Sequence, residues 1–188
     1  MQRIASTQPH ARGAHSSRGR RSALATFALL SLSVGACGGD ATGPGGLGSG
    51  SLTASGAITA SGSGIAVFQS VTSGGTSLFQ VVVAPLSQSA TTWELQIASY
   101  SGRPAVGTYN LSPLSASSTD PTASFYYTSA GNLQMFNSTS GQLVITSSSA
   151  ASVRGTFTFT ATDAAGGAGT VTAQGSFNAP CAPGITCQ

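Results

Sequence analysis

Side chains that commonly act as general bases or metal ligands are scarce in this sequence. Both histidines, His10 and His15, lie close to the amino terminus, and the chain contains no lysine. A serine nucleophile needs a neighbouring base to activate it, so the many serines carry no nucleophilic chemistry by themselves. The acidic residues are Asp40, Glu94, Asp120 and Asp163. Catalysis beyond the amino-terminal segment therefore rests on a pair of carboxyl groups or is absent.

A pair of carboxyl groups can hydrolyse a glycosidic bond. Each candidate also has a plainer position: Glu94 lies on the polar side of a predicted strand, Asp120 precedes Pro121 in a predicted turn, and Asp163 ends a predicted strand. A Ca²⁺ site would need closely spaced oxygen ligands, and no Asp-x-Asp run occurs. We expect no enzyme, no metal and no cofactor, with an acid-pair hydrolase as an alternative.

Positive charge is confined to the beginning of the chain. Five of the seven arginines precede residue 22, and only Arg103 and Arg154 follow residue 36. Against these two stand the four acids, a formal charge of −2 for this part of the chain. Binding to nucleic acid needs a clustered basic surface, so we expect no nucleic-acid partner.

The amino-terminal segment has the three parts of an export signal. A basic, hydroxyl-rich stretch ends at Arg20-Arg21, the apolar run Ala23–Val34 follows, and small residues come next. Twelve helical residues rise about 18 Å, which is too short to cross a hydrocarbon core of about 30 Å. We therefore predict a signal peptide over residues 1–36. The paired arginines loosely resemble a twin-arginine signal, and the general secretion route is the alternative.

The motif "VGAC", Val34 to Cys37, follows this apolar run and resembles a bacterial lipobox. The resemblance implies that the leader is cleaved before Cys37, that Cys37 carries the lipid, and that the membrane is a partner through this lipid. Because Gly38 rather than aspartate follows the cysteine, it also implies the outer membrane. An ordinary signal peptide with a nearby cysteine is the alternative.

Composition divides the rest of the chain into three parts. Residues 37–50 are rich in glycine and form a predicted flexible tether. Residues 51–178 form the predicted folded domain, and residues 179–188 form a carboxy-terminal tail. In the tail, "CAPGITCQ" places a Pro-Gly turn between Cys181 and Cys187. In an exported chain these two cysteines favour a disulfide, and a metal or redox pair would lack further ligands.

Alternation of apolar and polar residues indicates antiparallel β-structure throughout the domain. In "TTWELQIASY" the residues Trp93, Leu95 and Ile97 share one face. In later runs Phe157, Phe159 and Phe177 share the inward face. We predict an all-β fold, an antiparallel β-sandwich or barrel-like sandwich of about eight to nine strands. The predicted strands cover 52–60, 64–72, 77–84, 91–100, 106–111, 122–129, 142–147, 152–162 and 168–178.

The run "VRGTFTFTATDAAGGAGTVTAQGSFNAP", together with "PAVGTYNL", resembles uncharacterised β-rich domains of bacterial envelope lipoproteins. The resemblance implies a fold but no activity. We expect a non-enzymatic, lipid-anchored envelope module that binds a polymer or protein partner or serves structurally. A carbohydrate-binding or adhesin module is the alternative. For that alternative, Tyr100 and Tyr126 are the candidate ligand-binding residues, because both are predicted to point outward.

Overall fold

The computed structural model describes residues 46–87, 89–114 and 119–188. The chain divides into two compact units, Met1–Cys37 and Gly38–Gln188, and the first lies outside the described residues. The described residues form nine β-strands, which confirms the predicted fold class. They are β1 (Ser49–Gly56), β2 (Ala60–Ser73), β3 (Thr76–Ala84), β4 (Thr91–Ser99), β5 (Gly107–Asn110), β6 (Thr122–Ser129), β7 (Asn132–Ser148), β8 (Ser152–Asp163) and β9 (Thr170–Pro180).

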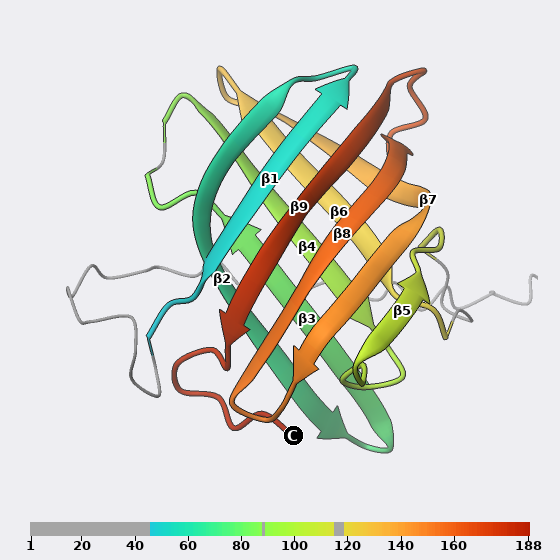
Figure 1. Cartoon of the computed structure of the whole chain (residues 1–188). Coiled ribbons are helices and arrows are strands. Elements are labelled where there is room, and N and C mark those ends of the chain that lie inside the picture. Colours follow the sequence, from blue (N-terminus) through green and yellow to red (C-terminus); the bar gives the residue numbers. More distant parts are fainter. Residues whose placement is uncertain (1–45, 88, 115–118) are drawn as a thin grey trace, which may run out of the picture. The chain divides into compact units, whose positions relative to one another are not determined.

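The strands form one antiparallel sheet that closes on itself. Their order is β5-β7-β6-β4-β3-β2-β1-β9-β8, and an additional β7–β8 pairing joins the ends into an eight-stranded barrel (Figure 1). Strand β5 lies outside this ring and pairs only with β7. Closure removes the free edges that an open sheet would expose. Of the two predicted architectures the barrel-like one is present, and the core lies inside one closed sheet instead of between two.

The boundaries of β7, β1 and β2 differ from the prediction. Strand β7 spans seventeen residues, whereas only 142–147 were predicted as strand. Its first part, "NLQMFNSTSG", is rich in Asn and Ser, and pairing with β6 and β8 holds it extended. Gly141 in this strand has φ +150°, and a Cβ there would lie 2.3 Å from the Thr158 carbonyl oxygen. Strand β1 begins at Ser49, two residues inside the predicted tether, and ends at Gly56 instead of residue 60. Strand β2 begins at Ala60 instead of residue 64, so the turn lies at residues 57–59, which were predicted as strand.

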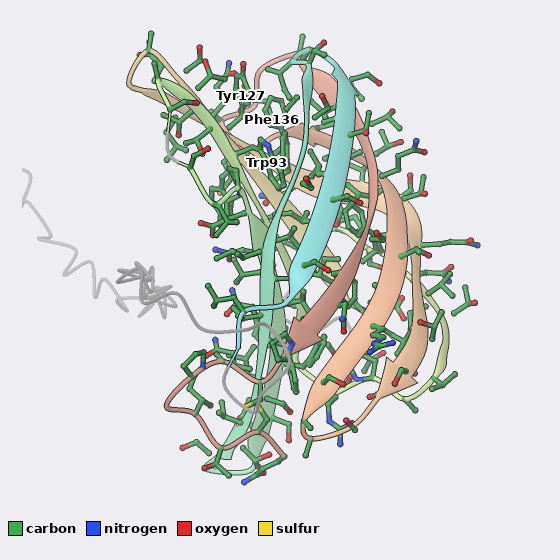
Figure 2. All side chains as sticks on the ribbon, turned by 60° about the vertical axis from the view of Figure 1, so that its left-hand side comes forward. Trp93, Tyr127 and Phe136 are labelled. Atoms are coloured by element: carbon green, nitrogen blue, oxygen red, sulfur yellow. A yellow bond between two sulfur atoms is a disulfide. The ribbon has the colours of Figure 1, made fainter. Side chains whose placement is uncertain are left out.

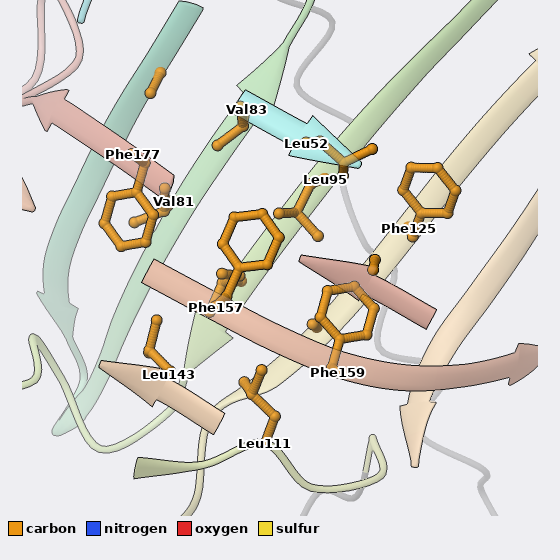
Figure 3. Close-up of a cluster of buried hydrophobic side chains, with 14 of the residues drawn as sticks. Leu52, Val81, Val83, Leu95, Leu111, Phe125, Leu143, Phe157, Phe159 and Phe177 are labelled. Atoms are coloured by element: carbon orange, nitrogen blue, oxygen red, sulfur yellow. The ribbon is translucent and has the colours of Figure 1, made fainter. Parts of the chain in front are cut away.

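Large apolar side chains fill the barrel. Figure 3 shows the rings of Phe157, Phe159 and Phe177 pointing into the interior. All six residues predicted for the core are buried: Trp93, Leu95, Ile97, Phe157, Phe159 and Phe177. The threonines that alternate with Phe157 and Phe159 on β8 point outward. The interior is therefore a packed core, and ligand contacts must come from the outer surface or the ends.

Trp93 lies towards one end of the barrel, with Tyr127 and Phe136 nearby (Figure 2). Trp93 is directly opposite Tyr127 on the neighbouring strand, and Phe136 pairs with Phe125 one step further inward. Trp93 is 7% exposed and Phe136 is 2% exposed. These aromatic side chains shield this end of the core from solvent.

Candidate binding surfaces

The carboxy-terminal tail carries the predicted disulfide. Cys181 and Cys187 are bonded, with their Cα atoms 6.0 Å apart. Cys187 is 8% exposed and belongs to the hydrophobic core, and Ile185 packs against that core. The backbone N–H of Ala182 donates to the Phe68 carbonyl at 2.8 Å. The tail thus lies along β2, where β1 no longer pairs with it, and covers the core there.

Tyr100 and Tyr126 are on the same side of the sheet but are not adjacent. Tyr126 on β6 lies directly opposite Glu94 on β4, whereas Tyr100 follows the end of β4. Six residues of strand separate the two positions, about 20 Å. Both side chains are half-buried. One small ligand would therefore not contact both rings.

The environment of each tyrosine raises its pKa. Burial raises the pKa of Tyr100. Burial also raises the pKa of Tyr126, the negative charge of Glu94 adds to this effect, and a hydrogen bond with Ser124 opposes it. Desolvation and a nearby anion both disfavour a charged phenolate. Tyr126 therefore stays a neutral hydroxyl-bearing ring beside a carboxylate.

A hydrogen-bonded row of long polar side chains crosses the outer face of β2, β3 and β4. Gln69 Nε2 donates to Gln80 Oε1 at 2.7 Å, and Gln80 Nε2 donates to Gln96 Oε1 at 2.9 Å. Gln96 Nε2 donates in turn to Glu94 Oε1 at 2.6 Å. We refer to these four residues, with Tyr126 at the end, as the polar row. In each bond the donor lies on the Gln69 side and the acceptor on the Glu94 side. The row therefore ends at the Glu94 carboxylate, which could accept hydrogen bonds from further donors.

Sequence reasoning missed three members of the polar row. Each glutamine occupies an outward position of its strand. Gln69 and Gln80 are directly opposite each other across the short β2–β3 hairpin, so the Gly74-Gly75 turn between them is a local signal for their contact. The contact of Gln80 with Gln96 depends in addition on the β3–β4 register. Gln80 lies opposite Ala98 and contacts Gln96 diagonally.

The three acids of the domain occupy separate places. From Glu94 the register runs through Tyr126 and Met135 towards Ala164, so Asp163 is about three strand spacings, or about 14 Å, away. Asp163 Oδ1 accepts from the Ala165 N–H at 2.8 Å and shapes the β8–β9 turn. Asp120 accepts from the Ser112 hydroxyl at 3.0 Å. The sheet does not bring these carboxyl groups together as a catalytic pair.

A pocket of about 220 Å³ lies where the chain passes from β4 to β6. Its walls come from the end of β4, the following loop, β5 and the residues before β6. They comprise Ser99, Ser101, Gly102, Arg103, Pro104, Ala105, Tyr109, Thr119 and Pro121. Arg103 is half-buried, and Ser99 is 1% exposed. Sequence reasoning did not identify this pocket, because its walls are brought together only by the β4–β6 pairing.

The predicted lipid attachment at Cys37, the signal peptide and most of the tether lie outside the described residues. Within the described residues, no helix is long and apolar enough to cross a membrane. In the same part of the chain, no group of three or more His, Cys, Asp or Glu side chains could hold a metal ion.

Comparison with known proteins identifies the family of this chain. The model of a family described as Domain of unknown function (DUF6252) matches residues 80–179, which is more than half of the 188 residues. The matched region begins within β3 and reaches almost to the end of β9. No curated protein and no solved structure matches the chain.

Proposed function

The chain belongs to the DUF6252 family of domains of unknown function, and from this premise we propose that it is an exported, lipid-anchored module that binds an envelope component without catalysing a reaction. The filled barrel is the observation that decides where a partner could bind. The interior holds the phenylalanine and leucine side chains of the core, so it offers no room for a carried ligand. Binding therefore uses the outer surface.

The outer surface of β8, β9 and β1 is suited to contacts with a neutral, hydrogen-bonding partner. Its exposed side chains are hydroxyls and one amide: Thr53, Thr156, Thr158, Thr172, Gln174 and Ser176. Charge on this face is limited to Arg154, whose Nε donates to Asn178 Oδ1 at 2.9 Å. A surface of this kind offers many donors and acceptors and does not repel a neutral polymer.

The proposed anchor would keep the barrel close to the membrane. Strand β1 begins at Ser49, twelve residues after Cys37. A glycine-rich coil of that length spans about 20 Å. A single acyl chain binds membranes only marginally, whereas the several chains of a mature lipoprotein bind firmly. The tether would therefore allow the barrel to rotate above the lipid surface while it stays attached.

Changing Cys37 to Ser tests the anchor. The wild-type protein should fractionate with membranes, and C37S should appear in the soluble fraction with its barrel folded. Mass spectrometry of the mature wild-type amino terminus should detect acyl chains on Cys37. An unmodified thiol there would overturn the anchor, and the binding role would then need a different route to the envelope.

A partner search tests the binding role directly. The intact lipoprotein, cross-linked in membranes and purified, should retain a specific polymer or protein. The double variant T158R/Q174R places charge on the outer surface of β8 and β9 and should lose that partner. The matched variant Q69R/Q96R places the same charge on the outer surface of β2 and β4 and should keep it. Equal loss in both variants would show that general charge, and not this wall, controls retention.

The polar row favours a second candidate, a carbohydrate-binding module. Amide and carboxylate groups beside a tyrosine ring match the hydroxyls and the apolar faces of sugars, and the row provides all three. If this candidate is right, Q96A and Y126A should each weaken retention on neutral polysaccharide, and T158A should not. Retention unchanged in Q96A and Y126A would exclude the polar row as the sugar site.

A further inference from the structure

The wall of the barrel is interrupted between β2 and β4. Strand β3 lies between these two strands, but it ends at Ala84, which pairs with Ile65 of β2. Strand β2 extends past this point through residues 60–64 (Figure 1). On the other side the register places Pro85 opposite Trp93 of β4, and proline has no N–H group to continue the pairing. These ends of β2 and β4 therefore flank a gap one strand wide, which we call the β2–β4 slot.

The backbone groups of β2 that face the slot have no partner. Ala66 exchanges two hydrogen bonds with Gly48, at 3.0 and 3.3 Å, on the side where β1 pairs with β2. Hydrogen-bonded pairs alternate along antiparallel strands, so the even-numbered residues of β2 bond towards β1. The N–H and C=O groups of Ser61 and Ser63 therefore point into the slot, where β3 has already ended. Within the described residues they form no hydrogen bond.

The first residues of β4 form the other wall of the slot. The Ala130 N–H donates to the Ala90 carbonyl at 3.1 Å, so even-numbered residues bond towards β6 and odd-numbered residues point towards the slot. The Thr91 carbonyl accepts a hydrogen bond from the Ser89 hydroxyl. The N–H and C=O of Trp93 form none in the part of the chain that the structure describes. Both walls thus present unpaired strand backbone, which is a template for pairing with another chain.

The Trp93 indole forms the floor of the slot. A Cβ on Gly62 would lie 3.6 Å from Trp93 Nε1 and 3.7 Å from Cζ2, so the indole reaches from β4 across to β2. Figure 2 shows Trp93 at this end of the barrel. A strand in the slot could place only small side chains above the indole. Residues 60–64 and 91–93 carry no charge, so a charged side chain inserted here would lose hydration without gaining a partner.

We propose that the β2–β4 slot binds an extended, neutral segment of a partner protein by strand addition, with Gly, Ala or Ser at every second position. Strands separated by one other strand lie two spacings apart, about 10 Å, so one extended peptide can bond to both walls. A sugar chain lacks this alternation of N–H and C=O groups. The proposal goes beyond binding at the outer surface of β8, β9 and β1 and does not depend on the anchor at Cys37.

The occupant must have both of its backbone edges free. Every strand in the described part of the chain is already paired along at least one edge, including β5, which pairs with β7. A folded strand of a second copy would have to leave its own sheet to enter the slot. An unpaired segment of a different protein has no such cost, and this favours it as the occupant.

A peptide titration tests the slot. The probe is acetyl-Thr-Ala-Thr-Ser-Thr-Ala-Thr-amide, and Trp93 is the only tryptophan of the chain, so its fluorescence reports binding directly. Binding should also slow hydrogen exchange of the Ser61, Ser63 and Trp93 amides at least tenfold. The same peptide with N-methyl groups at alternate residues, or with Phe in place of Ala, should bind at least tenfold more weakly. Absence of binding, or equal binding of the N-methylated peptide, would overturn strand addition.

A variant pair locates the bond on β2. S63P removes the N–H that faces the slot and should weaken peptide binding at least tenfold, whereas S63A keeps this N–H and should stay within twofold of wild type. Thermal unfolding of both variants detects misfolding, and the N-methylated peptide provides the same test on the unaltered protein. Equal binding by S63P and wild type would overturn the assignment.

Hydrogen exchange of the protein without peptide distinguishes the other occupants. The Ser61 and Ser63 amides should exchange fast at every protein concentration. Protection that increases with concentration would identify a second copy as the occupant. Protection that is lost on deletion of residues 38–45 would identify this segment of the same chain. Either result would overturn the assignment to a partner protein.

Discussion

Gly175 on β9 lies directly opposite Phe157 on β8, and the ring of Phe157 occupies the space that a Cβ at residue 175 would need. That Cβ would lie 2.5 Å from Phe157 Cζ. The arrangement is reciprocal, because Gly155 lies opposite Phe177 and its Cβ would be 3.0 Å from Phe177 Cζ. This explains the sequence elements "GTFTF" and "GSF": each glycine makes room for the phenylalanine of the other strand.

Replacing Gly175 with alanine should destabilise the barrel. The new methyl group would meet the Ser51 carbonyl oxygen at 2.0 Å as well as the Phe157 ring, and both must shift. Overpacking of this kind costs about 1–3 kcal/mol of unfolding free energy. Urea denaturation measures it, with the exposed T172A on the same strand as the control. Equal stability of G175A and the wild type would show that the wall relaxes freely at this point.

Truncating Phe159 should have a larger effect. The side chain is 1% exposed, and its ring centroid lies 6.0 Å from that of Phe157. F159A should lower the free energy of unfolding by about 3–5 kcal/mol, because the lost contacts leave a cavity. T158A, on the opposite face of the same strand, should stay within about 0.5 kcal/mol of wild type. A small effect of F159A would indicate that neighbouring side chains collapse into the space.

Breaking the disulfide should loosen the tail before it unfolds the barrel. The loop between Cys181 and Cys187 is short, so the chain-entropy estimate is about 2 kcal/mol. In the variant C181S/C187S the amide of Gln188, which donates to the Ser70 carbonyl at 3.1 Å, should exchange faster with solvent. Amides in the centre of β8 serve as the reference. Uniform acceleration of exchange in tail and barrel would show that the disulfide stabilises the whole domain.

The pKa of Tyr126 should respond to Glu94. Burial and the Glu94 charge raise this pKa above the ordinary value of 10.0. E94Q removes the charge and should lower it, as measured by the ultraviolet absorbance of tyrosinate, while D163N should leave it unchanged. Because the pKa of Tyr126 is higher in the folded than in the unfolded state, the neutral Tyr126 side chain contributes to the free energy of unfolding. This contribution is complete below about pH 10 and is lost as the pH rises through the folded-state pKa. No shift in E94Q would mean that burial alone raises this pKa.

Local patterns in the sequence predicted an all-β chain and the inward faces of its most regular strands, although the turn between β1 and β2 and most of β7 were predicted wrongly. Side chains alternate across a strand with a period of two, so Trp93, Leu95 and Ile97 had to share a face wherever the strand was placed. The same holds for Phe157 and Phe159. The first part of strand β7 was not predicted because "NLQMFNSTSG" lacks a clear alternation of apolar and polar residues. Its extended form depends on pairing with strands on both sides.

The sequence by itself determined that the domain is an antiparallel β-structure with a disulfide-closed tail and few groups for catalysis, because composition, alternation and cysteine spacing are local properties. Only the tertiary structure decided that the sheet closes, that Gln69, Gln80, Gln96 and Glu94 form a row, and that Arg103 meets Ser148 and Gln188. The Arg103 contacts join residues 45 and 85 positions apart, and closure of the sheet likewise joins distant strands, so both follow from the packing of the whole barrel. Bonded members of the row are only 2 to 16 positions apart, but their contact also requires the three strands to pair in this register.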